Sequence, residues 1–190
     1  DNGKIELDEL HMSDAEIKAL KKIVVIACGT AYHAGMIAKY VIEKWAKISV
    51  EVEIASEYRY RDPIIDANTL VIAISQSGET MDTLMAIRHA KAAGARVLAI
   101  CNTNSSTIPR ESDAVLYTHA GPEIAVASTK ALLTQIVAVD LIGLHLAQVR
   151  GELTDKQVRD LYNEMLELPG KIEQILETVE PLRALTRTFA

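Results

Sequence analysis

The sequence predicts an α/β protein, a three-layer α/β/α sandwich around a five-stranded parallel sheet. Five short runs with strand character recur along the first 120 residues, and helical patterns separate them. The runs are mostly continuous apolar stretches, as expected of parallel strands that are covered on both faces. Hydrophobic residues make up 49% of the chain but aromatic residues only 4%. We therefore expect an aliphatic core.

The elements of this sandwich can be assigned in order. A short helix is expected from Ser13, because Ser13 and Glu16 have capping-box spacing. Residues 32–46 and 81–93 have helical patterns that supply the crossovers, and Gly94 is a suitable stop for the second one. The flavodoxin-like strand order 2-1-3-4-5 is expected. The predicted strands are residues 23–28, 50–55, 70–75, 97–101 and 114–118.

After the fifth strand the pattern is helical only. Residues 123–150 form a long helical pattern that is apolar nearly all round, which predicts burial on more than one side, including against a partner subunit. Four polar residues interrupt its apolar part, so a buried helix is favoured over a membrane span: Thr134, Gln135, Asp140 and His145. Residues 155–166 and 171–178 are amphipathic, and Pro169 with Gly170 predicts a break between them.

Charge and cysteine usage narrow the function classes. The net charge is −6 without a basic block, which argues against nucleic acid and anionic membranes as partners. Cys28 and Cys101 lack a second Cys or a His at metal-ligand spacing, so they are expected to be reduced core thiols, with no metal site. No secretory leader opens the chain, which favours a cytoplasmic location. The chain starts at Asp1 and stops just after a helical pattern, so we expect a fragment of a longer polypeptide.

Residues 75–80 (Ser-Gln-Ser-Gly-Glu-Thr) are the most informative stretch, because they join a strand to a helix. Backbone N–H groups at a helix N-terminus favour an anion, and Ser75, Ser77 and Thr80 add hydroxyl groups there. Ser77 could instead be an ordinary helix cap that accepts the Thr80 N–H. No basic residue occurs in this stretch, so neutral donors would hold the anion, which suits a sugar phosphate better than a nucleoside triphosphate.

A second loop is expected to face this one. In the predicted strand order, the winding switches between strands one and three, and ligands bind beyond the carboxyl ends of strands at such a point. Residues 28–32 follow strand one, so Thr30 should lie across a crevice from residues 75–80. Dinucleotide-binding, P-loop and serine-nucleophile motifs do not fit, and we expect no cofactor.

Six segments resemble the sugar isomerase (SIS) domain family, specifically the first of two SIS domains in isomerizing aminotransferases that use fructose-6-phosphate. The similarity is close over residues 20–150. The segments are residues 28–30 (Cys-Gly-Thr), 52–61 (Val-Glu-Ile-Ala-Ser-Glu-Tyr-Arg-Tyr-Arg), 75–80, 99–102 (Ala-Ile-Cys-Asn), 110–113 (Arg-Glu-Ser-Asp) and 126–130 (Val-Ala-Ser-Thr-Lys). The resemblance implies a SIS domain at residues 1–150 and, at residues 151–190, a helical extension toward a second SIS domain that this chain lacks.

The resemblance also implies a reaction and a set of binding residues. Fructose-6-phosphate would react with ammonia from a separate glutaminase domain to give glucosamine-6-phosphate, and a homodimer is expected. The phosphate would lie on Ser75, Gln76, Ser77 and Thr80, with Thr30 near the sugar and Val126 and Ser128 closing the pocket. Many relatives have Ser where this chain has Ala31, so only backbone contacts are expected at Ala31. The catalytic Glu, Lys and His of the family belong to the second SIS domain and a neighbouring subunit, so this chain should bind without turnover.

Two other classes remain as alternatives. A sugar-phosphate-sensing regulatory domain would normally bring a helix-turn-helix domain and basic surface, and neither occurs here. A stand-alone SIS-type isomerase would need an acid/base pair within this chain, and no convincing pair is found. Lys130 remains open between an ion pair with Glu123 or Glu79 and an approach to the pocket. His33 is expected to be a partly buried structural histidine rather than a general base.

Overall fold

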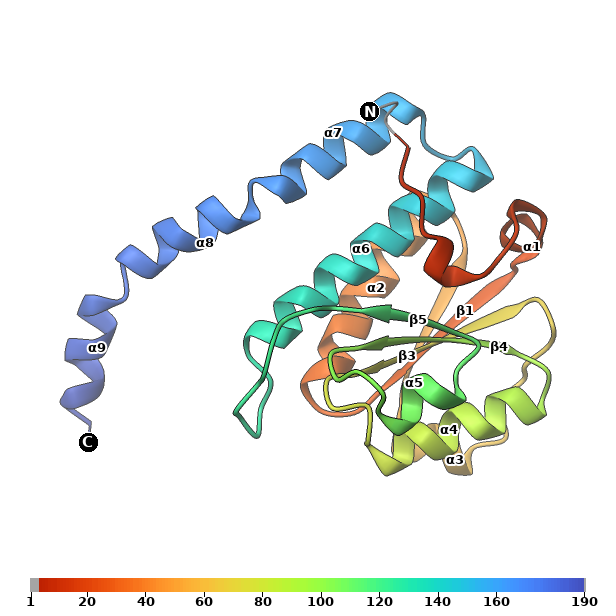
Figure 1. The fold of residues 1–190 in the computed structure, drawn as a ribbon, viewed down its shortest axis with the longest axis horizontal. Coiled ribbons are helices and arrows are strands. Elements are labelled where there is room, and N and C mark those ends of the chain that lie inside the picture. The colour runs from red at the N-terminus through yellow and green to blue at the C-terminus, as the bar shows by residue number, and fades with distance from the viewer. Residues whose placement is uncertain (1–3, 190) are drawn as a thin grey trace.

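The computed structural model describes residues 4–189, and a five-stranded parallel sheet forms the centre of that part of the chain (Figure 1). The strand order is β2-β1-β3-β4-β5, and every neighbouring pair is parallel. This confirms the predicted fold class and strand order. The strands are β1 (Lys22–Ala27), β2 (Ser49–Ile54), β3 (Thr69–Ser75), β4 (Arg96–Cys101) and β5 (Ala114–Tyr117).

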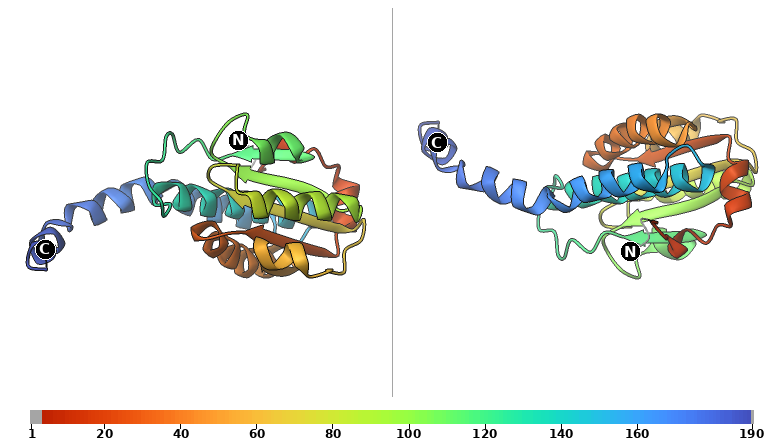
Figure 2. Two further views of the ribbon diagram at one scale, coloured as in Figure 1. Left: turned by 90° about the horizontal axis from the view of Figure 1, so that it is seen from below. Right: turned by 90° about the horizontal axis from the view of Figure 1, so that it is seen from above.

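Helices cover both faces of the sheet (Figures 1 and 2). α2 (Thr30–Ala46) and α6 (Lys130–Arg150) pack on one face, next to η1 (Asp8–Leu10) and α1 (Asp14–Ala19). The other face carries α3 (Ala55–Tyr60), α4 (Met81–Ala92) and α5 (Thr107–Glu111). The chain therefore winds on opposite faces on the two sides of the β1/β3 boundary, which is the predicted switch point.

Alternate residues of each strand enter two separate hydrophobic cores. On β1, Ile23 and Val25 belong to the core beneath α2 and α6, whereas Val24 and Ile26 belong to the core beneath α3, α4 and α5. Successive side chains of a strand point to opposite faces, so a strand that is covered twice must be apolar throughout. This explains why the strand segments read as continuous apolar runs.

The N-terminal helix α1 forms as its capping box predicts. The Ser13 hydroxyl accepts the Glu16 backbone N–H at 3.3 Å, and the Glu16 carboxylate accepts the Ser13 N–H at 2.7 Å. The shorter helices α3 and α5 are not apparent from the sequence pattern, because five or six residues are too few to establish a helical period.

The long apolar helix begins later than predicted. α6 starts at Lys130 rather than at residue 123, and residues 118–129 form a loop. The Glu123 carboxylate accepts hydrogen bonds from the Ala131 N–H and the Thr129 hydroxyl, both at 2.9 Å. A side chain from outside the helix thus satisfies the first-turn donors, so the residues before Lys130 need not be helical.

Burial accounts for the apolar character of α6. Within residues 4–189, α6 is the helix long and apolar enough to cross a membrane by length and composition alone. Its residues Val139 and Ile142 are fully buried and share a core with Ala38 and Ile42 of α2. Gly143 allows the close approach of the two helices, because a Cβ there would lie 3.2 Å from the Trp45 ring. α6 is a core helix of the sandwich, as the sequence predicts.

Three C-terminal helices extend away from the sandwich (Figures 1 and 2). α7 (Asp155–Leu166) matches its predicted range, and α9 (Glu180–Arg187) is an addition. The predicted break between the two helices lies at Glu167 rather than at Pro169 and Gly170, because α8 (Leu168–Glu177) includes both residues. Pro169 lies in the first turn of α8, where a backbone N–H would have no helical partner and a proline costs little.

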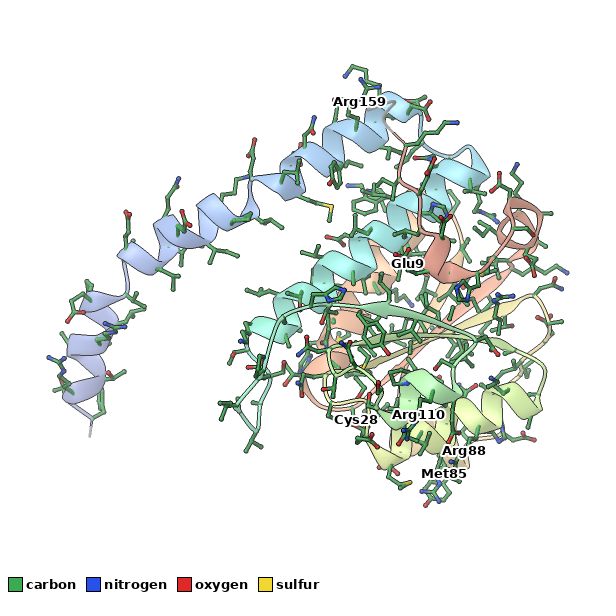
Figure 3. All side chains as sticks on the ribbon, in the orientation of Figure 1. Glu9, Cys28, Met85, Arg88, Arg110 and Arg159 are labelled. Carbon is green, nitrogen blue, oxygen red and sulfur yellow. The ribbon has the colours of Figure 1, made fainter. Side chains whose placement is uncertain are left out.

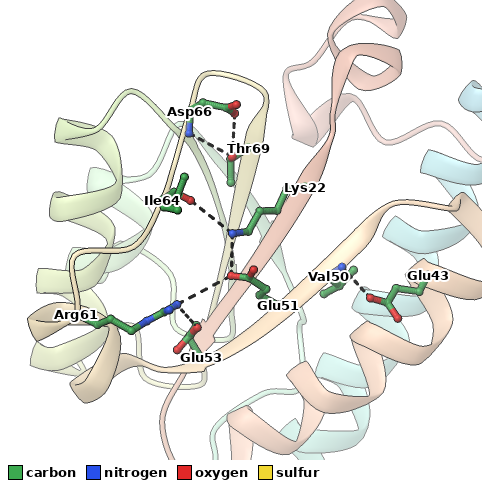
Figure 4. Close-up of polar contacts among 9 residues, drawn as sticks. All are labelled: Lys22, Glu43, Val50, Glu51, Glu53, Arg61, Ile64, Asp66 and Thr69. Atoms are coloured by element: carbon green, nitrogen blue, oxygen red, sulfur yellow. Dashed lines mark hydrogen bonds and ion pairs between the residues drawn. The ribbon is translucent and has the colours of Figure 1, made fainter.

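Ion pairs involve the side chains of β2, which is one edge strand of the sheet (Figure 4). Glu51 of the edge strand β2 pairs with Lys22 Nζ at 2.8 Å, and Glu53 pairs with Arg61 just after α3. Lys22 Nζ also donates to the Ile64 carbonyl at 3.4 Å. Charged side chains of this kind protect a sheet edge from pairing with another chain. Arg61 thus has a structural role in this edge network.

Candidate functional site

A cavity of about 390 Å³ lies at the carboxyl ends of β1 and β3. Three segments build its wall: the loop from β1 into α2, the loop from β3 into α4, and the segment that leads into α6. The structure places all eight sequence-predicted site residues on this wall. The lining residues are Cys28, Gly29, Thr30, Ala31, Ile74, Ser75, Gln76, Ser77, Thr80, Glu123, Ala125, Val126, Ala127, Ser128 and Gln135.

The loop from β3 into α4 is a hydroxyl-lined turn. The buried Ser75 hydroxyl accepts the Gly78 backbone N–H at 3.0 Å and lies 3.4 Å from the Thr80 hydroxyl oxygen. The Ser77 hydroxyl accepts the Glu79 N–H at 3.3 Å. α4 begins only at Met81, and its N-cap residue Thr80 makes no side-chain capping bond. Ser77 and Thr80 therefore precede the helix and do not share a helical face, and Ser77 is not the ordinary cap.

Gly78 holds this turn against the loop that follows β4. Its φ is +68°, and a Cβ on it would lie 1.9 Å from Ser106 Oγ and 2.8 Å from Cys101 Sγ. The Gly78 carbonyl accepts the Ile108 N–H at 2.9 Å, and the Gln76 carbonyl accepts the Asn102 N–H at 3.3 Å. The backbone of the turn is thereby fixed before any ligand arrives.

Cys101 supports the turn from below. Its side chain is fully buried, and burial raises the pKa of its thiol. A neutral thiol in this position packs beneath the turn and contributes no charge to the cavity.

The loop from β1 into α2 provides the facing wall. Gly29 has φ +57°, and α2 starts at Thr30 immediately after it. Thr30 is half-buried and Ala31 is buried, and both line the cavity. Ala31 has no polar side-chain atom to offer, so a polar contact there would use the backbone. Figure 3 shows Cys28 where β1 ends, close to this wall.

The third wall precedes and includes the start of α6. Val126 is fully exposed at the cavity mouth, whereas the Ser128 hydroxyl is buried and has no hydrogen-bond partner. Glu123 lines the cavity while its carboxylate bonds to Thr129 and Ala131. The hydrogen bond from the Ala131 backbone is the main cause that lowers the pKa of Glu123.

Cationic side chains lie elsewhere. No Lys, Arg or His lines the cavity among residues 4–189, so its hydrogen-bond donors are neutral hydroxyl, amide and backbone groups. Lys130 and His33 are both exposed and outside the lining, which corrects the expectation of a partly buried His33. Arg88 and Arg110 belong to the outer helical layer, where Arg88 pairs with Glu111 at 2.6 Å (Figure 3).

Glu79 serves a neighbouring helix rather than the cavity. Its carboxylate accepts the backbone N–H of Thr107, the first residue of α5, at 2.8 Å. The hydrogen bond from Thr107 lowers the pKa of Glu79. Glu79 thus stabilises the start of α5.

Two lining residues with hydrogen-bonding side chains, Glu123 and Gln135, are missed by the sequence reasoning. Glu123 is assigned there to the long helix, and Gln135 is treated only as one of the polar interruptions of an apolar stretch. Gln135 is fully buried, and neither atom of its side-chain amide has a partner. No sequence signal separates Gln135 from the other polar residues of this helix. Its placement on the cavity wall follows from the packing of α6.

The described residues offer no metal centre. Groups of three or more His, Cys, Asp or Glu side chains that could hold a metal ion are absent from residues 4–189. The chemistry that this wall supports is hydrogen bonding to an anion and to hydroxyl groups.

Comparison with known proteins identifies the family. The model of the SIS domain matches residues 16–144. The chain belongs to the SIS domain family. The chain is 60% identical over 189 residues to the glutamine–fructose-6-phosphate aminotransferase (isomerizing) of Streptomyces coelicolor. The matched region covers 100% of this chain and 31% of the relative. The same enzyme of Mycobacterium tuberculosis is 56% identical, over 99% of this chain and 30% of the relative.

Solved structures agree with this assignment. The C-terminal domain of glucosamine-fructose-6-phosphate aminotransferase from Francisella tularensis superposes with a TM-score of 0.80 at 43% identity, over 94% of this chain and 53% of that chain. Glucosamine-6-phosphate deaminase from Thermotoga maritima has a TM-score of 0.66 at 20% identity, over 95% of this chain and 58% of that one, which shows a shared fold only. This SIS domain thus spans about a third of the length of the curated relatives it matches.

Proposed function

We propose that this SIS domain is the substrate-anchoring half of the isomerase module of a glutamine–fructose-6-phosphate aminotransferase. In this proposal it binds fructose-6-phosphate, or the product glucosamine-6-phosphate. The observation that carries the proposal is the hydroxyl-lined turn of residues 75–80, which faces Thr30 across one cavity. The high identity to the two bacterial aminotransferases supports the substrate.

The turn is suited to a phosphate monoester. Ser75, Gln76, Ser77 and Thr80 offer hydroxyl and amide donors at one point, and the backbone is rigid because Gly78 is locked against the β4–α5 loop. Hydrogen bonds to a charged acceptor are stronger than bonds between neutral groups. Because these donors are neutral and no cation adds to them, we expect a moderate affinity for the sugar phosphate, which allows the product to dissociate. Thr30, the backbone at Ala31, Val126 and Ser128 would contact the sugar.

Catalysis requires residues beyond this chain in our proposal. Moving a proton between carbon atoms of a sugar needs a general base, and amine addition needs an activated carbonyl. Glu123 is the single carboxylate on the described wall, and its hydrogen bonds hold its pKa below the usual range. A carboxylate that is tied to a helix N-terminus in this way is a poor proton shuttle at neutral pH. A second SIS domain and a glutaminase domain would supply the missing groups and the ammonia.

The remaining chain fits the same proposal. Residues 1–150 would be the binding domain, and residues 151–190 would lead toward the second SIS domain. α8 and α9 carry exposed apolar side chains, among them Ile175, Leu182 and Leu185, which a further domain could cover. We also propose that the protein is a homodimer. The proposed cytoplasmic location is consistent with the two free cysteines.

Calorimetric titration tests the binding function. We expect saturable binding of fructose-6-phosphate and glucosamine-6-phosphate, and at least about tenfold weaker binding of fructose, because the phosphate supplies the charge-assisted bonds. Equal affinity for fructose, or no binding at millimolar fructose-6-phosphate, would contradict the proposal. A parallel assay with added ammonia should give no glucosamine-6-phosphate above background. Measurable product would instead place a complete catalytic set in this chain.

A further inference from the structure

Gln135 stands out because its side-chain amide is buried and unpaired. The residue lies in the second turn of α6 and is 0% exposed, and neither Nε2 nor Oε1 has a hydrogen-bond partner. Buried polar groups in proteins are paired as a rule, because an unsatisfied donor or acceptor loses its bonds to water without compensation. An amide that is unpaired at both ends therefore calls for a function or a bound partner.

The position of Gln135 indicates what that partner is. Gln135 lines the same cavity as Thr30 and the turn of residues 75–80. Ser128 lines it as well, and its hydroxyl is also buried and unpaired. Two unsatisfied side chains thus belong to one stretch of wall, where residues 123–129 lead into α6. Such a concentration of unused hydrogen-bonding groups marks a polar surface that a ligand or an ordered water completes.

The chemistry of an amide complements that of the turn. The turn of residues 75–80 offers hydroxyl and backbone donors, which suit an anion. The Gln135 amide offers two N–H donors and an acceptor oxygen side by side, which match a hydroxyl group that both donates and accepts. The fully ionised phosphate of a sugar phosphate has acceptor oxygens only and would leave the Gln135 carbonyl unpaired.

We propose that Gln135 is a further binding residue of this cavity and recognises the hydroxyl groups of the sugar, directly or through one water shared with Ser128. This inference rests on the proposed function and deepens it, because it assigns the two parts of a sugar phosphate to two walls. The turn of residues 75–80 binds the phosphate, and the start of α6 hydrogen-bonds to the hydroxyl groups of the sugar. Gln135 thus contributes to specificity rather than to anchoring.

The variant Gln135→Met tests the role, since methionine has a similar volume and no amide. We expect fructose-6-phosphate to bind about tenfold more weakly, while inorganic phosphate binds within about twofold of the unchanged protein. The melting temperature should stay the same or rise, because an apolar side chain replaces two unsatisfied groups. Gln174→Met is the matched control, because Gln174 lies exposed on α8, and it should change none of these values.

A second measurement needs no variant. In the unchanged chain, the side-chain NH₂ resonances of Gln135 should shift on titration with fructose-6-phosphate and stay in place with inorganic phosphate. Resonances that do not move, or unchanged fructose-6-phosphate affinity in the folded Gln135→Met protein, would overturn the role of Gln135 alone. If the unchanged chain fails to bind fructose-6-phosphate at all, the proposed function fails and this inference fails with it.

Discussion

The Ser75 hydroxyl accepts the backbone N–H of Gly78 at 3.0 Å, and this bond closes the turn between β3 and α4. Ser75 is the last residue of a central, fully buried strand, so the bond connects the sheet directly to the proposed phosphate site. The turn therefore inherits its rigidity from the sheet. A site that is formed before the ligand arrives loses less conformational entropy on binding.

Ser75→Ala should lower both stability and binding. Its removal leaves the buried Gly78 N–H without a partner, which costs about 1–2 kcal/mol of unfolding free energy. Ser77→Ala is the informative comparison, because the Ser77 side chain is exposed and its loss should leave stability nearly unchanged while still weakening fructose-6-phosphate binding. Denaturant unfolding and calorimetry measure the two effects. Equal stability of the two variants would contradict the structural role of Ser75.

Gly78→Ala should be more damaging than any single hydroxyl deletion. Position 78 combines a φ of +68° with a Cβ position 2.8 Å from Ser106 Cβ, so strain and overlap add. We expect a loss of roughly 2–4 kcal/mol of unfolding free energy. Gly94→Ala is the control, because its φ of +88° is equally unfavourable but no atom lies within 4 Å of its Cβ position. A loss of about 1 kcal/mol is expected there. Similar losses at both positions would show that packing against Ser106 is unimportant.

Glu123→Gln should loosen the third wall of the cavity. The Glu123 carboxylate is the acceptor that holds Thr129 and Ala131 at the start of α6, and an uncharged amide accepts these bonds more weakly. Because the pKa of Glu123 is lowered, its stabilisation is present at neutral pH and is lost as the pH falls through the folded-state pKa. The variant should melt at a lower temperature at pH 7 and approach the unchanged protein in acid. Glu152→Gln, on an exposed residue after α6, should have no such effect.

Asp140→Asn should reveal a partly buried carboxyl on α6. Burial raises the pKa of Asp140 from 3.8 to about 6, and its Oδ1 has no partner. The folded state therefore holds a proton that the unfolded state has released, and the stability from this group falls as the pH rises from about 4 to about 6. Relative to Asp140→Asn, the unchanged protein should lose on the order of 2 kcal/mol across this window. Parallel stability curves for the two proteins would contradict a raised pKa at this half-buried carboxyl, whose Oδ1 is buried and unpaired.

Most of the fold can be predicted from the sequence, because the residue pattern within each strand segment determines that element. Strands that are covered on both faces must be apolar at every position, so each of the five begins and ends within one residue of its predicted range. The first residue of α6 cannot be predicted in this way. Glu123 satisfies the first turn from a distance, and nothing in the local pattern of residues 123–129 encodes that contact. The sequence alone misplaces the break at Pro169, because a proline is equally compatible with a helix stop and with the first turn of a new helix.

The candidate site also has a part that can be predicted from the sequence and a part that cannot. The strand order and the loop composition together predict that Thr30 and the turn of residues 75–80 face one crevice, and in the structure both line one cavity. Their role in binding stays a prediction. Gln135 could not be selected from the sequence, because its distinguishing property is the absence of a partner in the folded protein. Only the packed arrangement of α6 reveals that property.

The most direct test of the central claim is to follow the backbone amide resonances of Ser77 and Thr80 by NMR while fructose-6-phosphate is added. If the turn of residues 75–80 anchors the phosphate, both resonances shift in a saturable manner, and glucosamine-6-phosphate moves them in the same way. Amides on the outer helices, such as that of Arg88, should stay in place. Resonances of Ser77 and Thr80 that do not move at millimolar fructose-6-phosphate would contradict the claim that this turn is a sugar-phosphate site.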